Sequence, residues 1–211
     1  MKKIIIINCG GNILSLIRAI NKNGYDPIIT NEPDKIENAT HIFLPGVGAF
    51  KNAMKRLENA NIINYLRNID YKKKNLMGIC LGMQILLSHG EEDGYCEGLN
   101  LISGKVKKIE FKNLKKKNLK IPNIGWHKLL YKNNLKENLI TKNIKYEDNC
   151  YFVHSYYVEP DIKDDCISYI NYGNLQIPAI IKKNKIYGCQ FHPEKSREYG
   201  LNLIENFLKL E

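Results

Sequence analysis

The sequence has no paired-cysteine pattern and no long hydrophobic run, and each absence excludes a class of protein. Its six cysteines include no C-x-x-C pair and no regular spacing, which argues against a zinc site or a disulfide framework. No stretch approaches the roughly 20 apolar residues of a membrane helix. The short apolar run at 4–7, after Met1-Lys2-Lys3, is too brief for the core of a secretion signal. We therefore expect reduced thiols, no metal and a cytoplasmic protein.

Arginine is also scarce, although the formal net charge is +10. The arginines are Arg18, Arg56, Arg67 and Arg197, and every other basic residue is a lysine. Arginine is the side chain that forks onto phosphates and guanine edges, whereas these lysines lie in scattered patches among many asparagines. The composition therefore argues against a nucleic-acid-binding module, whose affinity would fall steeply with salt.

The remaining composition, 44% hydrophobic and 26% charged over 211 residues, is typical of a globular protein, and we expect one domain over 1–211. The first half alternates strands and helices: it predicts strands at 3–7, 26–30, 41–44 and 76–79, with helical segments at 13–23, 33–38 and 49–68. The second half predicts closely spaced strands at 105–111, 125–131, 151–158, 166–172, 177–182 and 185–191, and a helix at 201–210.

This order of elements predicts an α/β fold with a mostly parallel central sheet, helices on both faces and antiparallel additions in the C-terminal half. In such sheets the chemistry lies at the carboxyl ends of the strands. Two glycine-rich loops, at 45–48 and 78–82, fall at such ends.

The segment Gly78-Ile-Cys80-Leu-Gly82-Met-Gln84 places a cysteine between two glycines at a strand-to-helix junction. This is the thiol form of a nucleophile elbow, in which only small neighbours leave room for a strained turn. The turn brings the sulfur to a helix N-terminus, where a thiolate is favoured. A buried structural cysteine in a glycine-rich turn is the alternative.

A second candidate segment, Gln190-Phe191-His192-Pro193-Glu194, ends the last predicted strand. His192 and Glu194 are two residues apart, so their side chains leave an extended segment on the same side. A cysteine nucleophile, a histidine base and an orienting carboxylate form a general triad. A simple strand-end turn is the alternative.

Two further segments complete the candidate site. The loop Pro45-Gly46-Val47-Gly48 lets backbone N–H groups approach an oxyanion, together with the Leu81 amide. The aromatic segment 151–157 carries two polar residues near its centre and, taken alone, is typical of a half-buried edge strand.

Taken together, these segments resemble one family. The resemblance rests on Pro-Gly-Val-Gly-Ala-Phe (45–50), the elbow (78–84), Gly-Trp (125–126), Phe-Val-His-Ser-Tyr (152–156) and Gln-Phe-His-Pro-Glu-Lys-Ser (190–196). In this order and spacing they are similar to the class I glutamine amidotransferases, which have a flavodoxin-like fold, and to the glutaminase subunits of imidazole glycerol phosphate synthase among them. The chain differs from the usual family pattern in two places. One is the segment Asn8–Asn12, and the other is His127, at a position where the family usually has asparagine.

The resemblance implies a role for each matching position. It makes Cys80 the nucleophile, His192 the acid/base and Glu194 its orienting partner. It implies an oxyanion hole at Gly46, Val47, Gly48 and Leu81, glutamine contacts at Gln84, Glu92, Ser155 and Tyr156, and partner contacts at Asn12, Trp126, Tyr151 and Lys195. The implied partner is a (βα)8-barrel synthase subunit that receives ammonia, and no cofactor is implied.

Three other functions use the same residues differently. A related glutaminase could supply ammonia to a sugar-modifying synthetase in surface-glycan pathways. A stand-alone cysteine hydrolase of γ-glutamyl bonds would work without any partner. A non-catalytic binding subunit is expected to lose a triad member, and this chain retains all three.

Overall fold

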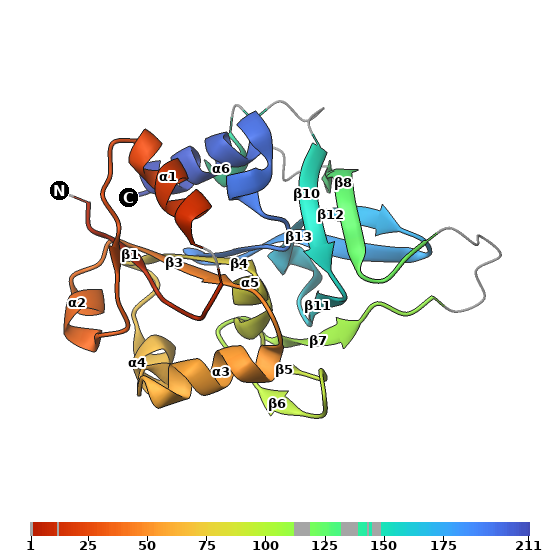
Figure 1. The fold of residues 1–211 in the computed structure, drawn as a ribbon, viewed down its shortest axis with the longest axis horizontal. Coiled ribbons are helices and arrows are strands. Elements are labelled where there is room, and N and C mark those ends of the chain that lie inside the picture. The colour runs from red at the N-terminus through yellow and green to blue at the C-terminus, as the bar shows by residue number, and fades with distance from the viewer. Residues whose placement is uncertain (1, 12, 112–118, 132–138, 143, 145–148) are drawn as a thin grey trace.

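The computed structural model describes residues 2–11, 13–111, 119–131, 139–142, 144 and 149–211. Among these residues the central sheet has eight strands, in the order β2-β1-β3-β4-β14-β13-β12-β9, and it forms the middle layer of the fold (Figure 1). Its strands are β1 (Ile4–Ile6), β2 (Ile28–Ile29), β3 (His41–Gly46), β4 (Asn75–Cys80), β9 (Leu130–Tyr131), β12 (Cys166–Tyr172), β13 (Leu175–Lys183) and β14 (Ile186–Cys189).

The pairing within this sheet changes partway across it. Strands β2, β1, β3, β4 and β14 run parallel to one another, whereas β13, β12 and β9 are joined on by antiparallel pairing. This confirms the predicted α/β class with antiparallel additions in the C-terminal half. The register places Gly46, at the end of β3, beside Cys80, at the end of β4.

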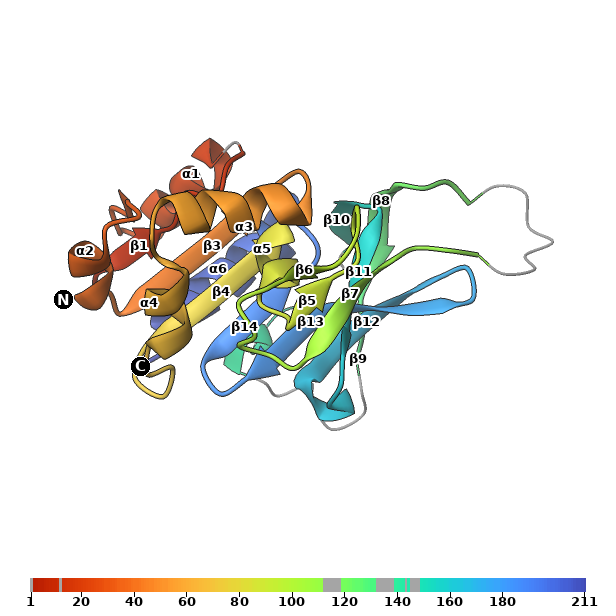
Figure 2. The ribbon, with the colours of Figure 1, turned by 90° about the horizontal axis from the view of Figure 1, so that it is seen from below.

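Helices cover both faces of the sheet. The α-helices are α1 (Leu14–Lys22), α2 (Pro33–Glu37), α3 (Phe50–Asn59), α4 (Ile63–Asn68), α5 (Leu81–Ile85) and α6 (Arg197–Lys209), and short 3-10 helices are η1 (Leu139–Thr141), η2 (Lys163–Asp165) and η3 (Pro193–Lys195). α1 and α6 lie on one face, and α3, α4 and α5 on the other (Figures 1 and 2). Alternate β1 residues accordingly enter different cores: Ile4 and Ile6 pack in one, and Ile5 packs in the other.

Two smaller sheets stand beside the carboxyl ends of the parallel strands. One pairs β10 (Asn149–His154) with β8 (Asn123–Lys128), and the other has the order β11 (Tyr156–Pro160), β7 (Gly104–Lys108), β5 (His89–Gly90), β6 (Cys96–Glu97). The single strand predicted at 151–158 is therefore wrong. The chain leaves one sheet and enters the other at Ser155, whose carbonyl accepts a hydrogen bond from the Ile109 N–H at 2.8 Å.

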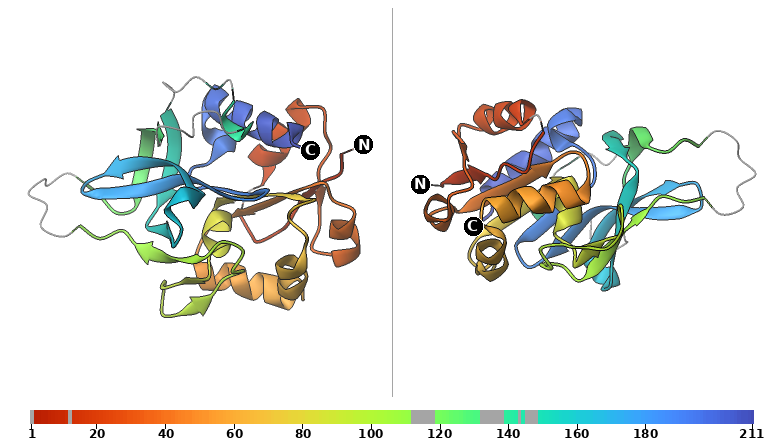
Figure 3. Two further views of the ribbon diagram at one scale, coloured as in Figure 1. Left: turned by 180° about the vertical axis from the view of Figure 1, so that it is seen from behind. Right: turned by 60° about the horizontal axis from the view of Figure 1, so that its bottom comes forward.

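The two ends of the chain lie at the same end of the molecule, far from β8 and β10 (Figures 1 and 3). Lys2 contributes to this arrangement because its Nζ donates to the carbonyls of Leu208 and Leu210, at 2.6 Å each. Within the described ranges, no helix is both long and apolar enough to cross a membrane.

Candidate active site

Cys80 sits at a sharp turn between β4 and α5. Its backbone adopts φ 53° and ψ −109°, a conformation that a side chain rarely takes and that stores strain. A Cβ on Gly82 would lie 1.6 Å from the Leu44 carbonyl oxygen, and a Cβ on Gly78 would lie 2.7 Å from the Gly82 oxygen. Both flanking positions thus require glycine, as the elbow interpretation predicts.

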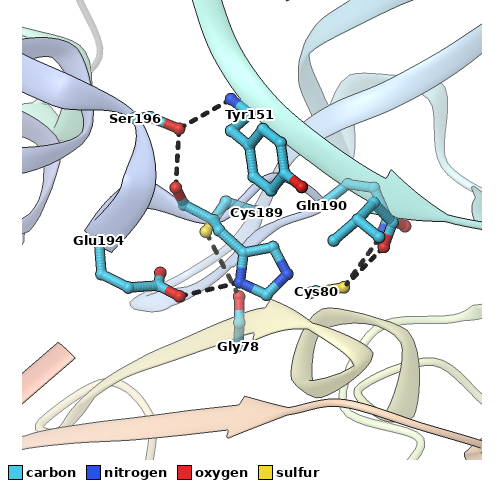
Figure 4. Close-up of polar contacts among 9 residues, drawn as sticks. Gly78, Cys80, Tyr151, Cys189, Gln190, Glu194 and Ser196 are labelled. Carbon is cyan, nitrogen blue, oxygen red and sulfur yellow. Dashed lines mark hydrogen bonds and ion pairs between the residues drawn. The ribbon is translucent and has the colours of Figure 1, made fainter. Parts of the chain in front are cut away.

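His192 and Glu194 lie together next to this elbow. The His192 Nδ1–H donates to Glu194 Oε1 at 2.8 Å, and both side chains are almost fully buried. Figure 4 shows Glu194 and Cys80 flanking the imidazole ring that Glu194 contacts. The other ring nitrogen, Nε2, has no hydrogen-bond partner in the described part of the chain. This leaves Nε2 available for proton transfer.

The surroundings of His192 favour its protonated form. Burial by itself lowers the pKa of the imidazole, but the interactions with Cys80 and Glu194 outweigh burial and raise the pKa to about 10. The Glu194 carboxylate, which accepts the ring N–H, stabilises the imidazolium. His192 therefore holds a proton that it can give to a leaving nitrogen.

The backbone of His192 is fixed by a small network that sequence reasoning missed. Ser196 Oγ donates to the His192 carbonyl at 2.7 Å and accepts from the Tyr151 N–H at 2.9 Å (Figure 4). The His192 N–H in turn donates to the Tyr151 carbonyl at 3.0 Å. Ser196 lies within the 190–196 segment, but the helix was predicted only from 201, whereas α6 begins at Arg197, so no signal in the sequence indicated this role.

The predicted oxyanion loop reaches the nucleophile. A Cβ on Gly46 would lie 3.2 Å from the Leu81 Cβ, so the two backbones are in close contact. Leu81 is the first residue of α5, where helix N–H groups have no partner within the helix. Val47 is 50% exposed and Gly48 has φ +101°. That the Val47 amide donates to an oxyanion remains a prediction.

Gln84, Tyr156 and Glu92, three of the four predicted glutamine contacts, lie near one another. Gln84 Nε2 donates to the Tyr156 carbonyl at 3.0 Å. Burial first, and then the charge of Glu92, raise the pKa of the Tyr156 hydroxyl, which places Glu92 near it. One Glu92 oxygen accepts the Phe50 N–H at 2.7 Å. Ser155 adjoins Tyr156 at the crossing between β10 and β11.

The predicted partner contacts form an exposed patch next to the triad. Trp126 is 43% exposed, and its ring lies 5.6 Å from that of Tyr151. Arg197, another residue that sequence reasoning missed, stacks its guanidinium 4.9 Å from the Trp126 ring centre. Lys195 is exposed nearby, and Asn12 lies outside the described residues.

Two cavities can be compared with the position of the triad. A cavity of about 20 Å³, the size of a single water, adjoins Val47, His192 and Glu194. The larger cavity of about 590 Å³ lies between α3, α4 and β6, away from the triad. Across the described ranges, no cluster of three or more histidine, cysteine or acidic side chains is placed to hold a metal ion.

This geometry defines the class of protein. The family model for glutamine amidotransferase class-I matches residues 5–210, nearly the whole chain. The chain therefore belongs to the class I glutamine amidotransferase family.

Full-length relatives point to one group within that family. The chain is 42% identical to imidazole glycerol phosphate synthase subunit HisH 2 of Methanococcus maripaludis over 98% of both chains. It is 37% identical to the HisH subunit of a Geobacillus species, over 97% of this chain and 95% of the relative. The fold also matches the structure of PurLQS from Thermotoga maritima, with a TM-score of 0.72, 18% identity and coverage of 99% and 98%.

Proposed function

We propose that this chain is the glutaminase subunit of an imidazole glycerol phosphate synthase in histidine biosynthesis. It hydrolyses L-glutamine to glutamate and ammonia, and a (βα)8-barrel partner uses the ammonia to form imidazole glycerol phosphate. The observation that carries the proposal is the Glu194-bound imidazole beside a strained Cys80, in a chain whose full-length relatives bear the HisH name.

The proposed reaction begins when the Cys80 sulfur attacks the side-chain amide carbon of glutamine. The Val47 and Leu81 amides stabilise the oxyanion, and each such donor contributes about 3–4 kcal/mol. His192 protonates the leaving nitrogen, which departs as ammonia and leaves a glutamyl thioester. His192 then takes a proton from water, which hydrolyses the thioester to glutamate and restores Cys80.

The residues predicted to contact glutamine support its recognition at this site. Glu92 supplies a carboxylate for the α-ammonium group, and its link to the Phe50 N–H fixes it against the start of α3. Tyr156 lies within electrostatic range of Glu92, and Ser155 precedes Tyr156 at the sheet crossing. Gln84 is linked to Cys80 through Gln190, and we infer that glutamine bound by this polar set presents its side-chain amide to the sulfur.

The exposed aromatic patch supports a partner on the triad side of the molecule. Trp126 contacts both the Tyr151 ring and the Arg197 guanidinium there, and Tyr151 is hydrogen-bonded to the His192 backbone. Aromatic and arginine side chains are the ones that carry most binding energy at protein interfaces. We also infer one amidotransferase domain over residues 1–211 and a heterodimer with the barrel. A cytosolic location, where thiols stay reduced, fits six cysteines without paired spacing.

The test is to measure glutamate release by the purified chain, alone and then with the candidate barrel subunit and its acceptor ligand. We expect the isolated chain to be nearly idle and the barrel to raise the rate at least about a hundredfold, by completing the oxyanion hole. Full activity in isolation would instead identify a stand-alone hydrolase. Activation only by a sugar-modifying synthetase would identify the surface-glycan glutaminase.

A further inference from the structure

Gln190 is a fully buried polar side chain that the proposed mechanism does not use. It follows β14 directly, and its exposed fraction is 0%. Its Nε2 lies 3.7 Å from the Cys80 sulfur, within range for a hydrogen bond to sulfur (Figure 4). Burying an amide costs free energy unless its hydrogen bonds are made, so the partners of the Gln190 amide determine why this position holds a polar residue.

A chain of hydrogen bonds determines which end of the Gln190 amide faces the sulfur. The Tyr156 carbonyl can only accept, so the Gln84 group that contacts it at 3.0 Å is the NH₂. The same nitrogen of Gln84 lies 3.2 Å from Gln190 Oε1, which therefore accepts from it. Gln190 must then present its own NH₂ to Cys80.

The Tyr156 carbonyl is itself held in place. His154 Nδ1 lies 2.8 Å from this oxygen and donates to it. The other His154 nitrogen then accepts from the Asn123 side chain at 3.0 Å, on the neighbouring strand β8. The Tyr156 carbonyl, from which the chain of hydrogen bonds starts, is thus held by His154, and Asn123 in turn holds His154.

The NH₂ group acts differently on the two protonation states of the sulfur. As a thiol, Cys80 donates weakly to the Val153 carbonyl at 3.8 Å. When the thiol ionises, this hydrogen bond is lost. The negative sulfur is then repelled by the partial negative charge of the carbonyl oxygen. An amide N–H remains a good partner in both states and is stronger toward the charged one. Gln190 therefore favours the ionised sulfur.

We propose that Gln190 is a positioning residue for the nucleophile: its amide N–H, oriented by Gln84, donates to the Cys80 sulfur and holds it in its reactive, ionised form. The role of Cys80 as a nucleophile, and therefore this proposal, rests on the proposed glutaminase function. It also couples the glutamine-binding side chain Gln84 to the nucleophile, although Gln190 itself has no predicted contact with glutamine.

The experiment measures how fast iodoacetamide alkylates Cys80 at pH values between 5 and 9, in the isolated chain and without glutamine. Mass spectrometry of the Cys80 peptide separates it from the other thiols. The half-buried Cys96, whose sulfur contacts the Glu97 carbonyl on β6, is an internal control in the same sample. Gln176→Glu, at an exposed position of β13, is the matched control for an amide-to-carboxylate change.

Gln190→Leu removes the donor with little change of volume. We expect about tenfold slower Cys80 alkylation at pH 7 and a midpoint of the pH curve about one pH unit higher, the size of one lost charge-assisted hydrogen bond. Gln190→Glu places a negative charge beside the sulfur, and we expect a larger effect. Cys96 alkylation and the Gln176→Glu protein should match wild type.

A double variant distinguishes orientation from mere packing. If Gln84 acts on the sulfur through Gln190, then Gln84→Leu slows alkylation, and Gln84→Leu with Gln190→Leu is no slower than Gln190→Leu alone. Two independent packing defects would instead add. Wild-type alkylation rates and pH midpoints in both Gln190→Leu and Gln190→Glu would overturn the proposal.

The outcome is separable from that of the proposed function. The alkylation assay needs neither partner nor substrate, so a chain that proves inactive as a glutaminase can still show the Gln190 effect. Conversely, wild-type alkylation in the Gln190 variants would leave the glutaminase proposal intact. Circular dichroism of each variant confirms that it is folded, and Gln190→Glu, which keeps the shape of glutamine, serves if the leucine variant does not fold.

Discussion

The two sides of the active site are built in different ways. The nucleophile side is shaped by steric exclusion: Gly82 packs so closely against β3, and Gly78 so closely against the backbone of α5, that no larger residue fits at either glycine. The base side is held by hydrogen bonds, in which Ser196 and Tyr151 fix the backbone of His192 and Glu194 fixes its ring. Close packing tolerates no substitution, whereas a hydrogen-bonded loop can lose one bond and keep its shape.

This difference suggests how a partner could act. The nucleophile side sits between β3, β4 and α5, which pack tightly against one another. The base side is linked through Tyr151 to the exposed Trp126 and Arg197. A partner bound to that patch would reach His192 through the Tyr151 backbone more easily than it would reach the elbow.

The largest expected effect removes the nucleophile. Cys80→Ala should abolish glutamine-dependent activity while leaving ammonia-dependent synthesis by the barrel complex intact, because the two reactions occur on different chains. Glutamate release and product formation from ammonium salts are measured on the same complex. Wild-type glutamate release in this variant would show that another group is the nucleophile.

On the base side, His192→Ala should cost more than Glu194→Gln. The imidazole transfers the proton, whereas the carboxylate only orients it and stabilises its charge. We expect a loss of about 10⁴-fold for His192→Ala and of about 10²- to 10³-fold for Glu194→Gln. Steady-state kinetics with saturating partner compare them, and equal losses would mean that ring orientation alone decides whether the base works.

The steric character of the nucleophile side predicts a large loss of stability in Gly82→Ala. The added methyl would lie 1.6 Å from the Leu44 carbonyl oxygen, so the backbone must move. Gly24→Ala is the matched control because its Cβ meets nothing and only its positive φ is unfavourable, at about 1–2 kcal/mol. Urea unfolding should show a clearly larger loss for Gly82→Ala, and equal losses would refute close packing as the constraint.

Two buried histidines away from the triad, His154 and His41, should make the folded protein less stable in acid. Burial lowers the pKa of His154 to about 4 and, with the charge of Lys2, that of His41 to about 4. Because these pKa values are depressed from the unfolded 6.5, their contribution to stability is complete above pH 6.5 and is lost as pH falls through about 4. His192 has the opposite sign: its contribution is present at low pH and is lost as pH rises through about 10.

Urea unfolding at pH 7.5 and pH 5 checks this, with His154→Gln for comparison. The free energy of unfolding should fall on acidification, by at most about 2 kcal/mol from His154 over this pH interval, and it should fall less in the variant. If the variant loses as much as wild type, another group is responsible.

We expect Lys195→Ala to have the smallest effect on folding. It should selectively weaken stimulation by the partner. Lys195 is exposed and directly follows Glu194. We expect the free energy of unfolding to change by less than about 0.5 kcal/mol, while stimulation by the partner weakens several-fold. Glutamate release with and without partner is the measurement, and undiminished stimulation would remove Lys195 from the interface.

The sequence alone predicted the class of fold, the elbow and the triad. Alternation of strands and helices is a local pattern, and the two glycines around Cys80 are a steric requirement that can be read from neighbouring residues. His192 and Glu194 were predicted for the same reason, since their spacing of two is local. The limits of the parallel strands were placed to within a few residues because hydrophobic runs mark them.

Only the tertiary structure decided which distant groups meet. It divided the predicted strand at 151–158 between two sheets, since a break at Ser155 depends on a contact with Ile109, far away in the chain. It also placed Gln190 against Cys80, Ser196 against Tyr151 and Arg197 over Trp126. A single polar residue belongs to no periodic pattern from which its contact could be predicted. Its role follows from the packing of separate strands rather than from its neighbours in sequence.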